Sequence, residues 1–193
     1  MRLIIFIGLF VVTNCCQAQL SSPEVRGLKS GRIPDDTSYV YTLPYEAGKG
    51  YVLVQGSNSS FSHKGELAYD FKMKTGTPVC AARGGVVVSL RSDSREGGLK
   101  DEHLSDGNYI VIQHADNSRA YYWHLQTGGV TVAIGDSVKQ GERIGFSGNT
   151  GYSAFPHLHF QVVDAQSKEI LVRFATKKGS RYLRPGRSYR RPA

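Results

Sequence analysis

Histidines recur in this sequence where a metal ion or a proton-transfer step could use them. His157 and His159 stand one residue apart in the stretch AFPHLHFQVVD, which also carries bulky apolar residues. Because successive side chains of a β-strand point to opposite faces, these two imidazoles share one face, and Leu158 and Phe160 share the other. Two neighbouring imidazoles suit a metal ion, although an isolated pair is also typical of the wetted face of a half-exposed strand.

Two further segments supply residues of the same kind. In FSHKGELAYDF, His63 precedes Asp70 by seven positions, with a glycine between them that allows a turn and a strand-like LAYDF that presents the carboxylate. In AYYWHLQ, alternation predicts that Tyr122 and His124 share one strand face. A structural histidine would explain either segment alone, so the case for chemistry depends on the whole set.

Nucleophilic catalysis has less support in the sequence. The Gly-rich segment VKQGERIGFSGNTG lacks the phosphate-loop pattern, and the stretch from Gly145 to Asn149 fails GxSxG at its last position, so we interpret the segment as turns that allow close backbone approach. Cys80 is predicted to be a small buried strand residue. A cysteine peptidase or amidase that pairs Cys80 with a histidine is the alternative class.

The segments that must position these residues are mostly β-strands. Short runs rich in β-branched and aromatic residues alternate with turns and predict an all-β, mainly antiparallel, sandwich-like fold with a loop-walled groove. The polar stretch 114–119 is predicted to be a hairpin loop, and 95–107 a surface flap. The expected strands are SYVYTL, YVLVQG, LAYDF, GGVVVSL, NYIVIQ, RAYYWHL, HLHFQVV and ILVRF.

The first residues have the pattern of an export signal. Arg2 precedes an apolar run, Leu3 to Val12, that is too short for a relaxed membrane span. Cleavage after Ala18 would remove residues 1–18, and lipid attachment at Cys15 or Cys16 is the alternative. Cleavage leaves Cys80 as the remaining cysteine, so packing or a metal must stabilise the mature chain.

The rest of the chain divides into three parts. A length of 193 residues suits one domain with extensions. We expect an N-terminal arm or linker at 19–38, the main domain at 39–173, and a basic C-terminal tail at 174–193. The tail accounts for most of the net charge of +8. In an exported protein it favours an anionic envelope polymer or a membrane surface over nucleic acid, and a disordered solvated tail is the alternative.

Taken in order, several motifs resemble those of the lysostaphin/LytM-type zinc metallopeptidases, which cut peptide bonds in bacterial peptidoglycan. The resemblance covers roughly Tyr51 to Asp164 and is carried by SHKGELAYDF, GTPVCAARGGVVV, YYWHL, VKQGERIGFSGNTG and PHLHF. It implies a zinc endopeptidase that acts on peptidoglycan cross-links or stem peptides. A catalytically silent wall-binding or amidase-regulating module of the same fold is the alternative that it leaves.

The resemblance also implies a role for each polar residue. His63, Asp70 and His159 would bind one Zn²⁺ and leave its fourth position open, while His124 and His157 would be the catalytic histidines. Many members of the family space the first ligand pair as HxxxD, whereas six residues intervene here. If Asp70 were misaligned, Glu66 would be the replacement ligand. His103 and His114 are predicted not to be ligands.

Overall fold

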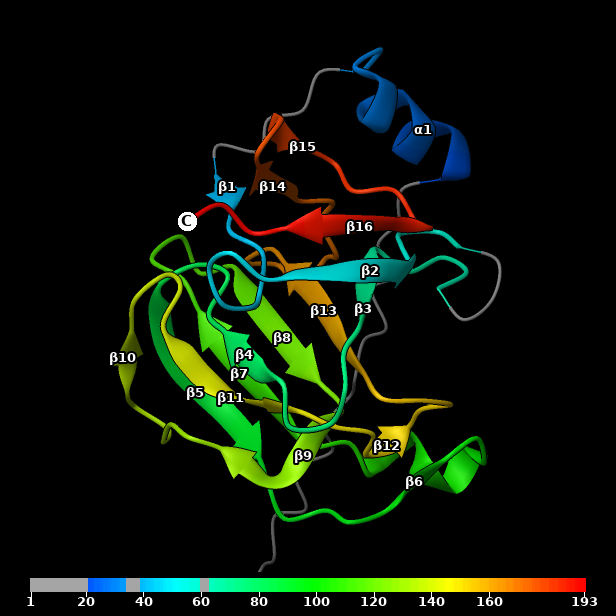
Figure 1. The fold of residues 1–193 in the computed structure, drawn as a ribbon. Helices are drawn as coiled ribbons and strands as arrows, with labels where there is room; N and C mark the ends of the chain where they lie inside the picture. Colours follow the sequence, from blue (N-terminus) through cyan, green and yellow to red (C-terminus); the bar gives the residue numbers. More distant parts are fainter. Residues whose placement is uncertain (1–20, 34–38, 60–62) are drawn as a thin grey trace, which may run out of the picture.

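The computed structural model describes residues 21–33, 39–59 and 63–193, so the predicted export signal lies outside the described residues (Figure 1). Strands dominate this part of the chain and pair mainly antiparallel, which confirms the predicted all-β class. The elements are α1 (Ser22–Ser30), β1 (Val40–Tyr41), β2 (Gly50–Gln55), β3 (Ala68–Lys72), β4 (Pro78–Cys80), β5 (Gly85–Arg91), β6 (Gly97–Gly98), the 3-10 helix η1 (Asp101–Ser105), β7 (Tyr109–Gln113), β8 (Arg119–Trp123), β9 (Leu125–Val130), β10 (Ser137–Val138), β11 (Arg143–Ser147), β12 (Gly151–Tyr152), β13 (His157–Val163), β14 (Arg173–Thr176), β15 (Gly179–Arg181) and β16 (Arg187–Arg190).

The largest sheet brings distant parts of the sequence side by side. It has eight strands in the order β10-β5-β7-β8-β13-β3-β2-β16. β7 and β8 form the predicted hairpin, in which Asn117 adopts a φ of 63° in the tight loop. β13 runs antiparallel to both β3 and β8, and therefore places its HxH stretch between two other strands.

One hydrophobic core packs against this sheet and fixes the outward face. Leu158 and Phe160 of β13 are fully buried, together with Tyr69, Phe71 and Tyr122 from the neighbouring strands. Burying a side chain of this size stabilises the fold by roughly 1.5–3 kcal/mol. A register slip of one residue would move these side chains into water, so the alternation holds the polar residues of β3 and β13 on the opposite face.

The Gly-rich segment forms more than turns. Its middle is β11, which pairs with β4 and β9 in a three-stranded sheet. A Cβ on Gly148 would lie 2.6 Å from the backbone nitrogen of Gln126, and one on Gly151 would lie 2.6 Å from the Cα of Gly107. The expected close approach of backbone to backbone is therefore present, and β12 follows directly, paired with β6.

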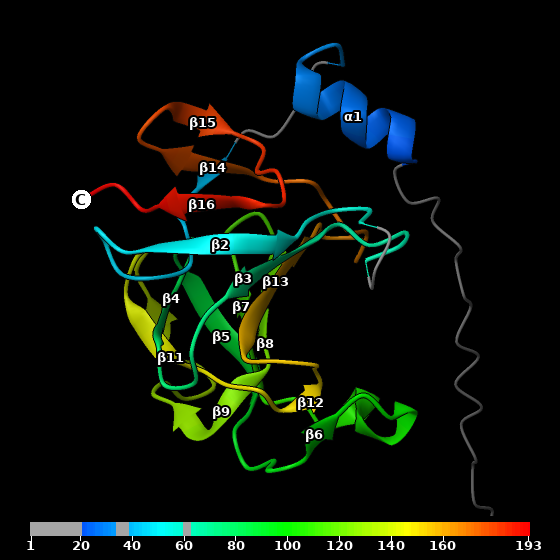
Figure 2. The same ribbon diagram turned by 45° about the vertical axis from the view of Figure 1, so that its right-hand side comes forward.

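The two ends of the described chain are more regular than their compositions suggested. Within the predicted arm, α1 begins with a capping box of Ser21 and Glu24 and ends at Gly31, which has a φ of 74°. The predicted basic tail contributes β14, β15 and β16, and β16 pairs with β2 at the sheet edge, so these residues are not a disordered tail. α1, β14, β15 and β16 gather at one end of the molecule, and β6, β12 and η1 at the other (Figure 2).

None of the helices in the described ranges combines the length and the apolar character that a bilayer-crossing helix requires.

Candidate metal centre

The pairing of β13 with β3 sets His159 opposite Asp70. The two residues are register partners, and His159 is also the partner of Trp123 on β8. Alternation along β13 turns His157 and His159 away from the core, as the sequence predicted. The HxH face therefore meets the carboxylate of the neighbouring strand at the middle of the sheet.

A turn carries His63 back to the same place. The backbone nitrogen of Glu66 bonds to the carbonyl of His63, and Gly65 takes a φ of 82°. The chain then enters β3, and Asp70 is the third residue of that strand. The wide spacing of His63 and Asp70 is thus spanned by one turn and the beginning of a strand. The His63 side chain is almost fully buried and faces Asp70.

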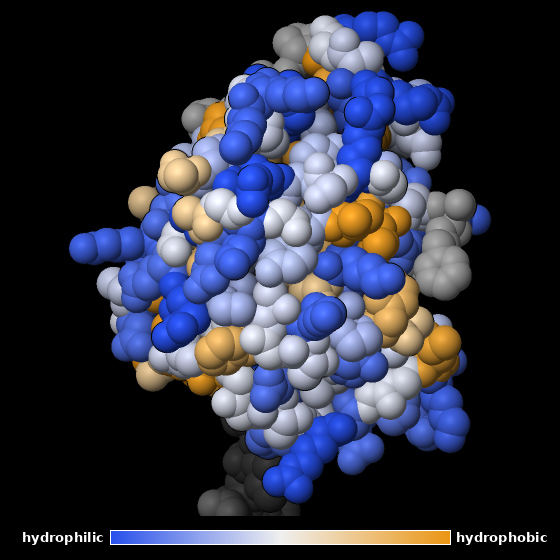
Figure 3. Space-filling model, viewed as in Figure 1, coloured by the Kyte–Doolittle hydropathy of each residue, from blue (hydrophilic) through white to orange (hydrophobic). Residues whose placement is uncertain are grey.

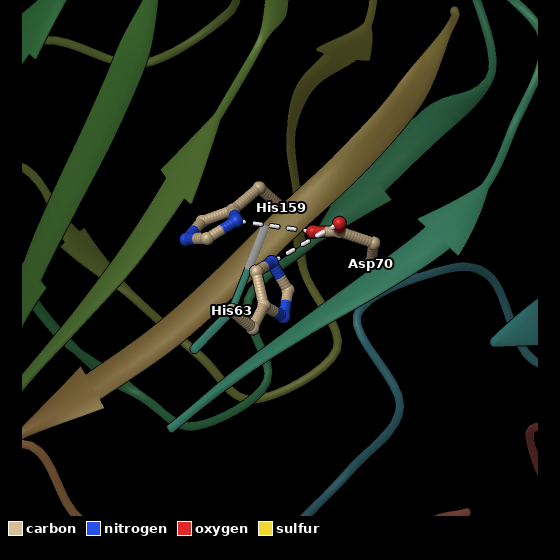
Figure 4. Close-up of side chains that lie close together, drawn as sticks. All are labelled: His63, Asp70 and His159. Carbon is tan, nitrogen blue, oxygen red and sulfur yellow. Dashed lines mark hydrogen bonds and ion pairs between the residues drawn. The ribbon is translucent and has the colours of Figure 1, made fainter. Parts of the chain in front are cut away.

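These three side chains converge on one point (Figure 4). His63 Nε2 lies 3.1 Å from Asp70 Oδ2, and His159 Nδ1 lies 3.0 Å from Asp70 Oδ1. One ligand atom from each residue fits within 4.8 Å of the others. Zinc bonds of about 2.0–2.2 Å in tetrahedral geometry place the ligand atoms about 3.3–3.6 Å apart. The donor set and its spacing therefore fit a zinc ion held by two imidazoles and one carboxylate.

Glu66 lies at the margin of this cluster. Its Oε1 is 3.4 Å from Nε2 of His159, the ring nitrogen that faces away from Asp70, and its Oε2 is 4.0 Å from Nε2 of His63. Asp70 approaches both imidazoles more closely than Glu66 does. If His159 binds a metal, Glu66 lies beside its second ring nitrogen, where a carboxylate would hold the orientation of the ring.

Gln55, at the end of β2, is a site residue that the sequence reading missed. Its Nε2 donates a hydrogen bond of 2.9 Å to Asp70 Oδ2. Burial alone would raise the pKa of Asp70, but the hydrogen bonds from His159 and His63 outweigh it and hold the pKa below its usual range. Burial likewise opposes the charged form of His159, yet Asp70 raises the pKa of that imidazole. Asp70 is therefore a charged carboxylate held by three donors.

His124 reaches the cluster through an unusual backbone. It follows the last residue of β8 with a φ of 63°, a conformation that histidine adopts more readily than most residues. The alternation of β8 stops there, so His124 does not share a face with Tyr122 as predicted. Tyr122 is fully buried, and its hydroxyl accepts a hydrogen bond from the Ala82 backbone nitrogen, whereas Trp123 lines the groove.

Backbone carbonyls set the proton positions of both remaining histidines. Nδ1 of His124 lies 2.8 Å from the carbonyl oxygen of Thr150, and Nδ1 of His157 lies 2.8 Å from that of Phe155. A carbonyl can only accept, so each Nδ1 donates, and each Nε2 of the neutral ring keeps a lone pair. Burial and the nearby His157 and His159 lower the pKa of His124 to about 3. Burial also lowers the pKa of His157, although the charge of Asp70 opposes the shift.

A groove surrounds the five polar residues. Its volume is about 450 Å³. The predicted flap forms part of its wall, since Leu99 and Leu104 are exposed to solvent and line it. His103 belongs to the same flap and faces Asp106, and His114 is buried beside Gly84, so neither joins the cluster. The other apolar lining residues are Trp123, Tyr152, Ala154 and Phe155.

Comparison with known proteins finds relatives for this part of the chain. The model of peptidase family M23 matches residues 61–170, more than half of the 193 residues. Peptidoglycan DD-endopeptidase ShyA of Vibrio cholerae is 42% identical over 94 residues, which make up 49% of this chain and 19% of that protein. Lysostaphin of Staphylococcus simulans is 40% identical over 118 residues, or 61% of this chain and 21% of that protein. The chain thus spans about a fifth of the length of these two relatives.

A solved structure gives a similar match. The catalytic domain of the antimicrobial peptidase lysostaphin from S. simulans aligns with a TM-score of 0.47 and 34% identity, over 65% of this chain and 87% of that one. The segment that the family model matches includes every histidine of the cluster and Asp70. Because this match extends over more than half of the sequence, the chain belongs to peptidase family M23.

Proposed function

We propose that this protein is a zinc-dependent endopeptidase that hydrolyses peptide bonds in peptidoglycan cross-links or stem peptides. The observation that carries the proposal is the convergence of His63, Asp70 and His159 within 4.8 Å on the floor of a groove. Zinc bound by these three residues would polarise the scissile carbonyl and make water a nucleophile near neutral pH. The relatives named above, a peptidoglycan DD-endopeptidase and lysostaphin, support the choice of substrate.

His157 is assigned the role of general base. Its Nδ1 is engaged by the Phe155 carbonyl, and the Ser153 hydroxyl lies 3.1 Å from the same atom, so the ring is fixed and Nε2 is free to accept a proton. That Nε2 lies 3.7 Å from Asp70 Oδ1, beside the proposed ligands. A neutral ring with a free Nε2 at this place could take a proton from a water bound among the proposed ligands.

His124 is assigned the role of holding the attacking water. Its ring centre lies 4.6 Å from that of His157, and its lowered pKa keeps the ring neutral at pH 7. Because its Nδ1–H is donated to Thr150, Nε2 can accept a hydrogen bond from water in the resting enzyme. It would stabilise an oxyanion only after it had gained a second proton.

The substrate is proposed to lie along the apolar walls of the groove. Leu99, Leu104 and Phe155 line the same groove as the proposed ligands. An extended peptide with small side chains would fit between such walls. We also propose that residues 1–18 direct export, which would bring the enzyme to this substrate.

The proposal is tested by metal analysis and digestion of purified cell-wall sacculi. The protein without residues 1–18 should contain one zinc per chain and release new peptide termini, whose sequence identifies the bond. The His159→Ala variant should lose both properties. Bound zinc without any released product from the unmodified chain would overturn the peptidase assignment in favour of a silent wall-binding or regulatory module.

A further inference from the structure

A second groove lies at the end of the molecule where α1 meets the C-terminal strands. Its volume is about 810 Å³, and it shares no lining residue with the groove of the metal centre. Figure 3 shows hydrophilic residues gathered over α1 and β16 in this region. We call it the basic groove, after its cationic lining residues. These are Lys29, Arg173, Lys177, Lys178, Arg181, Arg184, Arg187 and Arg190.

The positive charge of the basic groove is not balanced from within. Among the described residues, its lining contains no carboxylate. Burial lowers the pKa of Lys29, and the nearby charge of Arg184 lowers it further, which is the effect of like charges brought together. Folding thus gathers cations at some cost, and an anion placed among them would relieve that cost.

The fold, rather than the sequence alone, builds this surface. Lys29 comes from α1, whose Val25 belongs to the hydrophobic core. Arg187 and Arg190 come from β16, which is held in the main sheet by β2, and Lys177 and Lys178 lie in the turn between β14 and β15. The cations are therefore set on paired strands and a packed helix, which limits the entropy lost when a ligand binds.

The shape of the basic groove favours a linear ligand. Its cations come from α1, from the turn between β14 and β15 and from β16, so an extended chain of anionic groups can contact several of them at once. Leu28 and Ile33 are the aliphatic side chains of the lining, and Ile33 is 39% exposed. The eight cationic side chains of the lining offer many hydrogen-bond donors to anionic oxygens.

We propose that the basic groove binds a linear polyanion, a polymer that carries phosphate or carboxylate groups along its length. The two grooves share no lining residue, so each can be altered by substitution without changing the lining of the other. This inference does not depend on peptidase activity, because a binding measurement alone decides it.

The test measures binding of labelled inorganic polyphosphate to the protein without residues 1–18 by fluorescence anisotropy. A variant with Lys177→Gln, Lys178→Gln and Arg184→Gln removes three exposed cations from the basic groove. It should bind the probe at least about tenfold more weakly and show a shallower dependence of affinity on salt, since fewer counterions are displaced.

The matched control removes the same charge at exposed positions outside the basic groove. Lys74→Gln, Lys139→Gln and Arg143→Gln together should change affinity by less than about threefold. Equal losses in the two variants would show that binding reflects net charge alone and would overturn the proposal. Circular dichroism and thermal unfolding check that both variants fold.

Two competitors test the identity of the ligand. Orthophosphate at the same phosphate concentration should displace the probe poorly, because a single ion contacts few of the cations that a polyphosphate chain contacts together. Equal displacement would overturn the proposal in favour of a simple anion site. Vesicles of phosphatidylglycerol and phosphatidylcholine should bind more weakly than polyphosphate, and stronger binding that the groove variant abolishes would assign the surface to membranes instead.

Discussion

Gln55 donates a hydrogen bond to Asp70 across the pair of strands β2 and β3, at a distance of 2.9 Å. This contact is made from a residue outside the segment that the family model matches. It fixes the orientation of the carboxylate that both imidazoles face. The candidate metal centre therefore includes a contact from a strand that contributes none of its three proposed ligands.

Replacing Gln55 should weaken metal binding without removing a ligand. Gln55→Leu keeps the size of the side chain but loses the donor to Asp70, and zinc affinity should fall about 10–100-fold, as for other partners of ligating groups. Competition with a chromogenic chelator measures the change. Gln161→Leu changes a glutamine in the same groove, and zinc affinity should stay the same. An unchanged affinity in Gln55→Leu would remove Gln55 from the metal centre.

Substitution of the two catalytic candidates should separate metal binding from turnover. His157→Ala and His124→Ala should keep one zinc per chain and lose about 10²–10⁴-fold in kcat/KM, because the proton acceptors are lost and the ligand set is intact. His63→Ala should lose both zinc and activity. Metal analysis and peptide cleavage on the same preparations compare the three variants. Zinc loss in His157→Ala would make that residue a ligand.

The hydroxyl of Tyr122 should matter for stability and not for catalysis. It lies 2.8 Å from the Ala82 backbone nitrogen, so Tyr122→Phe leaves a buried donor without its partner at a cost of about 1–3 kcal/mol in the free energy of unfolding. Trp123→Phe should instead raise KM, since Trp123 lines the groove. Urea unfolding and steady-state kinetics distinguish the two effects, and the opposite pattern would contradict the assignment of faces.

His114 should make the protein less stable in mild acid. Burial lowers the pKa of His114 from 6.5 to about 4, and the ring packs on Tyr41. The charge of Arg83 also lowers this pKa, whereas the Gly84 carbonyl and Asp116 raise it. The unfolded chain therefore binds the extra proton first. Stability is lost as pH falls from about 6.5 to about 4, by up to about 3 kcal/mol from this residue.

The measurement for His114 is the difference between two proteins. His114→Asn retains a donor for the Gly84 carbonyl but does not titrate, so its unfolding free energy should decline less between pH 7 and pH 4 than that of the parent. Because other buried histidines titrate in both proteins, the difference isolates His114. Parallel curves would show that His114 does not contribute to acid sensitivity.

Cys80 should be dispensable for chemistry. It lies in β4, outside the lining of the metal-centre groove, and burial raises the pKa of its thiol, which disfavours the reactive thiolate. Cys80→Ser should leave kcat/KM within about threefold of the parent protein. A loss of activity with zinc still bound would revive the cysteine peptidase alternative.

Much of the sheet could be predicted because its signal is local. The alternation in HLHFQVV sets the faces of β13, and GGVVVSL, NYIVIQ and RAYYWHL lie where β5, β7 and β8 form. The position of His124 could not be predicted this way, because a positive φ interrupts the alternation just after Trp123. An alternating pattern predicts faces only while the backbone stays extended, so it cannot reveal that one residue takes a left-handed conformation.

Other features depend on partners far away in the sequence. The run RSYR has no pattern that marks it as a strand, and it becomes β16 because β2 offers it an unpaired edge. Gln55 was missed for the same reason, since its bond to Asp70 depends on the register between two strands. α1 did carry a local signal, with Ser21 and Glu24 in capping-box spacing and Gly31 after the last turn, which the reading of this stretch as a linker overlooked.

β16 also bears on how the molecule behaves when it is concentrated. Unpaired strand edges invite pairing with other chains, and β2 would present such an edge if β16 did not cover it. β16 itself carries Arg187 and Arg190, and the other end of the sheet is the two-residue strand β10. The arginines of β16 disfavour pairing with another chain at one edge of the sheet, and β10 is too short to pair well at the other edge. Removing residues 187–193 should therefore leave a protein that aggregates through β2.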